Sequence, residues 1–205
     1  MSVILIKPDL EHLPAFLNAL ERGWSPDNVR GAEAAAEILA KAAEDPAAVV
    51  GAMDDPEAKA GPIRLPDGSE VERLPGFHRW LWDGDFCGVI GLRWRPGTPE
   101  LPPHVLGHIG YAVVVWKRGR GYASRALGLL LPEAAARGLP WVELSTDADN
   151  IASQRVILNN GGYLVDRFRK PAAYGGAESL RYRIPLNGPA VPDAGVWPAP
   201  VRRII

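Results

Sequence analysis

A glycine-rich basic loop between an apolar run and a helix is the feature that most constrains this chain. The run Gly107–Val115 reads GHIGYAVVV, the loop Lys117–Ala123 reads KRGRGYA, and a helical pattern continues to about Arg137. A strand that feeds such a loop into a helix presents free backbone N–H groups and the positive end of the helix dipole. Gly119 and Gly121 let that backbone approach an anion without an intervening Cβ. We expect a polyphosphate to bind here.

Three basic side chains in this loop, Lys117, Arg118 and Arg120, add charged donors for phosphate oxygens. A strand-to-helix turn with a solvated basic face explains the fragment equally well, because isolated glycine motifs are weak signals. The pattern GxxxxGK[ST] of a P-loop is missing. A dinucleotide GxGxxG also fails, since Ser124 stands at the third glycine position. The signature [QR]-x-x-G-x-[GA] of acyl-CoA binding is met.

The remaining pattern predicts an α/β (α+β) fold: a mixed, mostly antiparallel sheet flanked by helices, with a central strand–glycine loop–helix unit. The expected strands are 3–6, 77–82, 86–94, 107–115, 141–146 and closing strands between 164 and 184, and the expected helices are 9–20, 25–44, 118–137 and 150–160. We predict one domain over 1–186, a loop insertion at 51–76 and a proline-rich extension at 187–205.

Charge and cysteine content exclude several classes of function. The chain has 23 basic and 24 acidic side chains, a net charge of -1 and an isoelectric point near 6.4, which gives no overall attraction to nucleic acid or membrane. The apolar N-terminal run is too short for a signal peptide or membrane span. A single cysteine, Cys87, fits a reducing compartment, so we expect a cytoplasmic protein. His104 and His108 have no third ligand nearby, so no metal is expected.

Two long stretches resemble the GNAT superfamily of N-acetyltransferases. GHIGYAVVVWKRGRGYASRAL is similar to the family's fourth strand, pyrophosphate loop and third helix, and STDADNIASQRVILNNGGY is similar to the end of its fifth strand and the following helix. Together they extend the resemblance over roughly 77–163. Asn150-x-x-Ser153 followed by Asn160-Gly161-Gly162 matches the family's NxxS…NGG form. The chain looks most like a group of bacterial acetyltransferases whose substrate is not obvious.

The resemblance implies acetyl-CoA as co-substrate and assigns residues to it. The pantetheine arm would pair with the strand backbone at Val113–Val115, and the pyrophosphate would bind the amides of Arg118–Ala123. The residues carried over are Val113, Val114, Val115, Arg118, Gly119, Arg120, Gly121, Tyr122, Ala123, Asn150 and Ser153. Asn150 and Ser153 share one helix face toward the cofactor arm, although Asn150 could equally be a plain N-cap.

The catalytic residues are less constrained. Many family members place a tyrosine acid where this sequence has Ile157, so Tyr111, Tyr122 or water would have to protonate the thiolate, unless it leaves unassisted. An imidazole ordinarily titrates near neutrality, and His108 lies where some members place a catalytic glutamate, which makes it a candidate base; a buried structural histidine is the competing interpretation. Glu143 is a second candidate base.

The predicted function is therefore N-acetylation: direct transfer of acetyl from acetyl-CoA to a primary amine of a small molecule or peptide. A non-catalytic acyl-CoA-binding or sensing domain is the alternative, because the tyrosine is missing. The acceptor pocket is expected near Trp24 and the 51–76 loop. A homodimer is an option within this class, and neither nucleic acid nor membrane is an expected partner.

Overall fold

The computed structural model describes residues 2–64 and 68–186 of the 205-residue chain. Its elements in chain order are β1 (Ile4–Ile6), α1 (Leu13–Glu21), α2 (Ala32–Glu44), α3 (Pro46–Gly51), β2 (Asp54–Asp55), β3 (Ile63–Arg64), β4 (Glu70–Val71), β5 (Gly76–Trp82), β6 (Phe86–Arg93), β7 (Ile109–Val113), the 3-10 turn η1 (Val115–Lys117), α4 (Tyr122–Ala135), β8 (Trp141–Asp147), α5 (Ile151–Leu158), β9 (Tyr163–Arg169), η2 (Ala172–Tyr174) and β10 (Glu178–Pro185).

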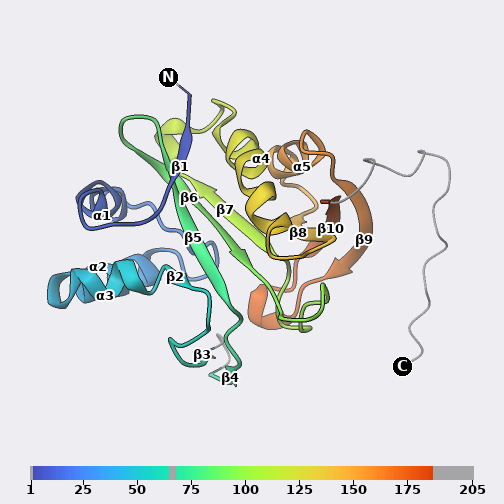
Figure 1. Ribbon diagram of the computed structural model, residues 1–205, viewed down its shortest axis with the longest axis horizontal. Coiled ribbons are helices and arrows are strands. Elements are labelled where there is room, and N and C mark those ends of the chain that lie inside the picture. The colour runs from blue at the N-terminus through green and yellow to red at the C-terminus, as the bar shows by residue number, and fades with distance from the viewer. Residues whose placement is uncertain (1, 65–67, 187–205) are drawn as a thin grey trace.

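The strands form two main antiparallel sheets. In the first the order is β1-β5-β6-β7, with β2 also paired to β5, and in the second it is β8-β10-β9; β3 and β4 make a separate hairpin. Figure 1 shows α1, α2 and α3 on one side of the first sheet and α4 and α5 on the other. The predicted mixed, mostly antiparallel fold flanked by helices is confirmed.

Two hydrophobic cores hold these layers together because neighbouring strand residues point to opposite faces. Phe16 from α1 stacks on Trp80 of β5 with ring centroids 5.3 Å apart, on the side of the first three helices. On the other face, Leu127 and Leu130 of α4 are fully buried against Ile90 of β6 and its neighbours. The sheet therefore separates two faces, and each can carry a different binding site.

The N-terminal half differs from the prediction in three places. Helix α1 begins at Leu13, not near Asp9, whose carboxylate instead accepts the His12 N–H (2.8 Å). Helix α2 begins at Ala32, because Asp27 caps a turn ahead of it rather than a helix. The 51–76 segment is not a plain loop: it contains β2, β3 and β4. The predicted extension 187–205 lies outside the described residues, and the single-domain boundary stays a prediction.

The two sheets meet at one junction. The backbone N–H of His108, just before β7, donates to the Glu143 carbonyl of β8 at 2.7 Å. Gly107 lies so close that an added Cβ would be 2.9 Å from the same carbonyl oxygen. In the described part of the chain no other backbone hydrogen bond links β7 to β8. Past the junction, each of these strands therefore leaves an edge unpaired.

The His108 side chain completes this junction. Its Nδ1 accepts the Glu143 backbone N–H (3.0 Å), so the proton of the neutral ring must lie on Nε2, which donates to the Pro99 carbonyl (3.1 Å). The ring is fully buried, and burial lowers the pKa of His108 to about 4. Both nitrogens are occupied, so the geometry gives His108 a structural role in place of the predicted role as a general base.

The stability of the protein should report this role. Between its ordinary pKa near 6.5 and about 4, the unfolded chain takes up a proton that folded His108 excludes, so stability falls as the pH drops through that window, by about 3 kcal/mol. His108→Ala should cost about 2 kcal/mol or more at pH 7.5, because two buried backbone groups lose their partners. The gap to the wild type should shrink at pH 4.5.

Denaturant unfolding at both pH values measures this. His108→Asn, whose side-chain oxygen can replace Nδ1 as the acceptor, should recover part of the loss. Equal stability of His108→Ala and the wild type at pH 7.5 would rule out the junction role.

Candidate active site

The free edge of β7 is the first component of the site. The Val114 N–H donates to the Cys87 carbonyl of β6 (2.9 Å). Because alternate residues of a strand bond to the same neighbour, the backbone groups of Tyr111 and Val113 face away from β6, toward the gap beside β8. An extended arm of a ligand can pair with that edge as an additional strand would.

The structure narrows the predicted pairing segment Val113–Val115. Strand β7 ends at Val113, the N–H of Val114 is already bonded, and Val115 begins η1 with 61% of its surface exposed. The Arg118 Nε donates to the Val113 carbonyl at 3.2 Å. The unpaired part of the edge is therefore the backbone of Tyr111 and the N–H of Val113, one or two residues earlier than expected.

The glycine-rich loop follows η1 and ends at the N-terminus of α4. Gly119 and Gly121 both have φ of 75°, which non-glycine residues rarely adopt, and no atom lies within 4 Å of where a Cβ would be. The amides of Tyr122 and Ala123 lie in the first helical turn, where no carbonyl of the helix can accept from them. The loop is exposed, so these N–H groups form an open cradle for an anion.

Lys117 does not belong to this cradle, although the sequence placed it there. Its Nζ is buried and donates to Asp83 of the β5–β6 turn at 2.7 Å, and the Tyr122 hydroxyl donates to the other oxygen of Asp83 at 2.6 Å. Burial alone would raise the pKa of Asp83, but these hydrogen bonds hold it well below its usual range. Asp83 thus anchors the loop at both ends, and Tyr122 is committed to that anchor instead of being a free acid.

On the other side of the gap, the start of α5 faces the β7 edge. The Asn150 side chain accepts the Ser153 N–H (3.1 Å), so Asn150 is an N-cap. The Tyr111 hydroxyl donates to the Ser153 carbonyl at 3.4 Å, and burial raises the pKa of Tyr111. Tyr111 is therefore a protonated donor between strand and helix. Ile157 is buried in the core.

Glu143 is not a free carboxylate. Arg183 of β10 donates to it at 2.7 Å, and Arg181 lies 3.8 Å away. Two guanidinium groups hold its charge, so removal of a proton from an amine would require breaking these pairs. The structure favours the plain strand-carboxylate interpretation of Glu143.

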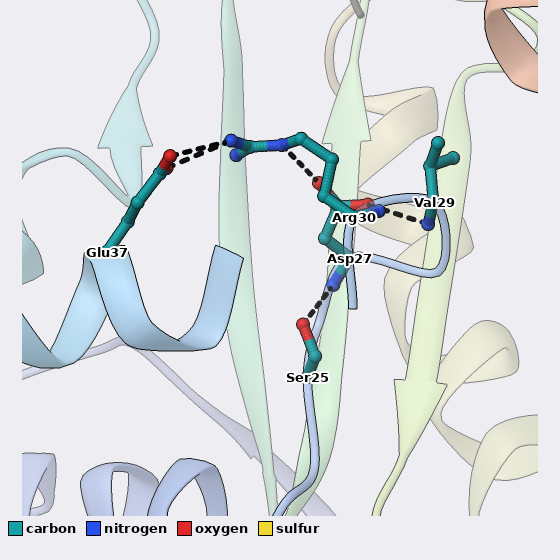
Figure 2. Close-up of polar contacts among 5 residues, drawn as sticks. All are labelled: Ser25, Asp27, Val29, Arg30 and Glu37. Atoms are coloured by element: carbon teal, nitrogen blue, oxygen red, sulfur yellow. Dashed lines mark hydrogen bonds and ion pairs between the residues drawn. The ribbon is translucent and has the colours of Figure 1, made fainter. Parts of the chain in front are cut away.

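A groove of about 780 Å³ covers the face of the first sheet on which α1, α2 and α3 lie. Its walls come from the segment that joins α1 to α2, from Asp55, Ile63 and residues 71–74, and from η2. Part of its rim is a closed ionic cluster, shown in Figure 2: Arg30 contacts Asp27 at 3.4 Å and Glu37 at 2.9 Å. Hydrogen bonding to Glu37 raises the pKa of Arg30. This charge is neutralised by its own neighbours.

The floor of the groove is a glycine strip. Gly91 of β6 and Gly110 of β7 are directly opposite each other, and His78 of β5 pairs with Gly91 on the other side. The His78 ring lies over Gly91, since an added Cβ would be 2.7 Å from its Cδ2. A guanidinium nitrogen of Arg93 lies 3.4 Å from the Cβ position of Gly110. Because these two positions lack side chains, the His78 ring and the Arg93 guanidinium lie close to the backbone of β6 and β7 and form the floor of the groove.

His78 and Arg93 were not identified from the sequence, where each appears to be an ordinary residue of an alternating strand. In the groove, desolvation by the walls and the charge of Arg93 lower the pKa of His78 to about 4. A neutral imidazole keeps one nitrogen lone pair. No carboxylate lies within 4 Å of either side chain in the part of the chain that the structure describes. The signal available in the sequence was a histidine on the first strand of a predicted hairpin whose second strand contains glycines.

The described residues contain no set of three His, Cys, Asp or Glu side chains placed to hold a metal ion. None of their helices has the length and apolar character required to cross a membrane. Cys87 is buried, and burial raises the pKa of its thiol to about 11, which keeps it protonated and unreactive.

The Asp83 anchor gives a direct test of how the loop is held. Asp83→Asn should destabilise the protein by about 3 kcal/mol, because it leaves the buried ammonium of Lys117 with only the exposed Asp85 carboxylate, 3.4 Å away, as a charge partner. Tyr122→Phe removes one hydrogen bond to Asp83 and leaves the ion pair intact, so it should cost clearly less. Unfolding at pH 7 measures both, and equal effects of the two variants would contradict the ion pair as the main anchor.

Solved structures with the same architecture are known. They include RimL, the ribosomal L7/L12 alpha-N-protein acetyltransferase, in complex with coenzyme A (16% identity, 90% of this chain and 94% of that chain, TM-score 0.56). Others are the microcin C7 self-immunity acetyltransferase MccE in complex with acetyl-CoA and AMP (12%, 90% and 92%, 0.53) and an acetyltransferase of the GNAT family from Bacillus anthracis (15%, 91% and 96%, 0.55). At these identities the likeness shows the fold.

Among curated proteins no sequence matches this chain. A family model does: the acetyltransferase (GNAT) domain matches residues 3–162, which include the β7 edge, the glycine-rich loop and α5. The match extends over most of the chain and agrees with the resemblance carried by the loop and the NxxS…NGG segment. The chain therefore belongs to the GNAT acetyltransferase family and is an acyltransferase.

Proposed function

We propose that this protein transfers acetyl from acetyl-CoA directly to a primary amine. One observation carries the proposal: the free β7 edge is reached from both faces of the sheet. The anion cradle and α5 approach it on one face, and the groove approaches it across the glycine strip on the other. Two substrates can therefore meet at one backbone segment without a covalent enzyme intermediate.

On the cofactor face, the pyrophosphate of acetyl-CoA binds the amides of the loop and of the first turn of α4, with Arg118 and Arg120 at its edge. The pantetheine arm pairs with the backbone of Tyr111 and Val113 and extends past Ser153. A free N–H of this edge polarises the thioester carbonyl, which stabilises the oxyanion that forms in the transition state.

The chemical step then needs two proton transfers. The amine nitrogen forms a bond to the carbonyl carbon, the carbon–sulfur bond breaks, and the sulfur leaves as thiolate. Tyr111 is placed to give the thiolate its proton, because its hydroxyl lies between β7 and α5 and stays protonated. His78 takes the proton that nitrogen loses: it is a neutral imidazole on the floor of the acceptor groove.

The family assignment favours this enzyme over a non-catalytic acyl-CoA-binding domain, and release of thiol with an amine separates the two. The acceptor is a small-molecule or peptide amine, in keeping with a groove of about 780 Å³. RimL, which shares the fold, is named for acetylation of a protein N-terminus, and MccE is named for self-immunity. We expect the protein to act in the cytoplasm.

Substitution of two glycines, one in the loop and one outside it, tests whether the loop binds the pyrophosphate. Gly121→Asp should abolish binding of acetyl-CoA, because it adds a negative charge where the pyrophosphate binds. Gly138→Asp is the matched control: Gly138 also has a positive φ (78°) and open space around its Cβ position, so it suffers similar backbone strain at the far end of α4. Calorimetric titration with acetyl-CoA measures both. Normal binding by Gly121→Asp would place the phosphates elsewhere.

Substitutions distinguish the roles of His78 and His108, the two histidines whose pKa is lowered. His78→Gln should lower turnover by roughly 10²-fold, with unchanged affinity for acetyl-CoA and an unchanged melting temperature. His108→Asn should lower the melting temperature and leave turnover per folded molecule within a few-fold. Steady-state kinetics with thiol detection, normalised to folded protein, gives both numbers. Near-normal turnover of His78→Gln would leave a water molecule as the proton acceptor.

A further inference from the structure

We infer that the acceptor carries a carboxylate a few bonds from its amine, and that Arg93 binds this carboxylate. The inference rests on the proposed function, since it concerns the second substrate of the same site. It follows from three features of Arg93: its missing charge partner, its position over the glycine strip, and the neutral groups around it.

The charge of Arg93 is not balanced by the protein. Among the other cations that line the groove, Arg30 pairs with Asp27 and Glu37, and Lys170 pairs with Asp147. Arg73 donates to the Gly61 carbonyl, and Lys41 lines the groove on the side of α2. Among the described residues, no carboxylate contacts Arg93 within 4 Å and no hydrogen bond from its guanidinium is found. Of the other acids that line the groove, Asp55 accepts the amides of Lys59 and Ala60, and neither Asp55 nor Glu72 forms an ion pair with Arg93 within 4 Å.

The groove makes this charge available to a ligand. The Arg93 side chain is exposed to water, yet the surrounding walls desolvate it enough to lower its pKa from the ordinary value. A guanidinium remains charged at every physiological pH. Because the walls already desolvate the guanidinium, an anion that binds there displaces little water from it and gains strong, charge-assisted hydrogen bonds.

The neighbours of Arg93 define the chemistry of the anion. His78 and His108 are both held neutral, each with a pKa of about 4, and Tyr174 lies close enough to influence Arg93. Over the glycine strip the cation is Arg93, since Arg79 pairs with Glu133 and the Arg73 guanidinium donates to the Gly61 carbonyl. Its planar donor fork matches the single charge and the two oxygens of a carboxylate. A phosphate dianion would need a second cation at the same place.

Geometry limits the distance between this carboxylate and the amine. The Arg93 guanidinium lies above Gly110, and the β7 edge that we assign to the thioester arm begins at the next residue, Tyr111. Adjacent strand residues are about 3.4 Å apart along the strand, so the Arg93 guanidinium and the thioester arm at Tyr111 are separated by roughly 7 Å or less. Two classes of acceptor meet this limit. The first is a free amino acid, through its α-carboxylate, and the second is a peptide with an N-terminal Asp or Glu, through its side-chain carboxylate.

Matched acceptors distinguish these sources. One arm compares the free amino acids with their carboxamides, and the second compares amidated peptides that begin with Asp or Glu with those that begin with Asn or Gln. Within each pair the amine is the same and only the carboxylate changes. In at least one arm, the wild type should prefer the carboxylate by on the order of 10- to 100-fold in kcat/KM.

Variants then assign that preference to Arg93. Arg93→Gln should bring the carboxylate-to-amide ratio close to one, mainly through KM for the acceptor, with an unchanged KM for acetyl-CoA. Arg93→Lys keeps the charge without the fork and should give an intermediate ratio. Arg95→Gln is the charge-matched control two residues later, outside the groove lining, and should keep the wild-type ratio.

The outcomes separate this inference from the proposed function. If amines are acetylated with a ratio near one in both arms, or if Arg93→Gln keeps the wild-type ratio, the inference is wrong and amine acetylation stands. If no amine is acetylated, the proposed function fails, and calorimetric titration of the CoA-loaded protein with N-acetylglycine and N-acetylglycinamide decides about Arg93. Binding of only the carboxylate, lost in Arg93→Gln, supports the anion site; equal binding of both compounds, or binding of neither, overturns it.

Discussion

The whole site depends on the junction at which β7 and β8 touch once and then run unpaired. A continuous ladder between these strands would satisfy every backbone group and leave nothing for a ligand. The hydrogen bonding between β7 and β8 therefore has to be strong at one point and absent beyond it. His108 achieves this with its backbone N–H and both ring nitrogens, and Gly107 allows the strands to approach closely. Its two ring bonds are possible only for a neutral histidine, which is why burial and function of this ring are linked.

The open edge gives each face of the sheet its own task. On one face the chain supplies backbone donors, held in place by the Asp83–Lys117 pair and the Tyr122 hydroxyl, so the loop needs no ligand to keep its shape. On the other face it has no side chains at Gly91 and Gly110, so that the His78 ring and the Arg93 guanidinium can lie against the strand backbone. Rigid backbone donors on one side and a groove floored by an imidazole and a guanidinium on the other suit an enzyme that mainly positions two substrates.

The sequence revealed the cofactor side better than the acceptor side, for a physical reason. A glycine loop between a strand and a helix is a local pattern, and so is the N-cap at Asn150; both are read within a few residues. The role of Lys117 depends instead on Asp83, 34 residues earlier, and no local signal shows that the Lys117 ammonium is already paired with this carboxylate. His78 and Arg93 meet only because β5 and β6 pair in one register. The 51–76 segment looked irregular because its three strands are only two residues long.

The charges on the acceptor face also connect binding to catalysis. After desolvation, the largest influence that lowers the pKa of His78 is the charge of Arg93, followed by Arg73 and Arg79, while the Met53 carbonyl acts in the opposite direction. Arg79 is already paired with Glu133, and Arg73 donates to the Gly61 carbonyl. Arg93 has the largest influence of the three and lies over Gly110, so it is the member of this set whose charge an acceptor carboxylate on the glycine strip would neutralise. Under the two proposals together, binding of that carboxylate raises the pKa of His78, and the imidazole becomes the stronger base at the moment when an amine is present to lose its proton.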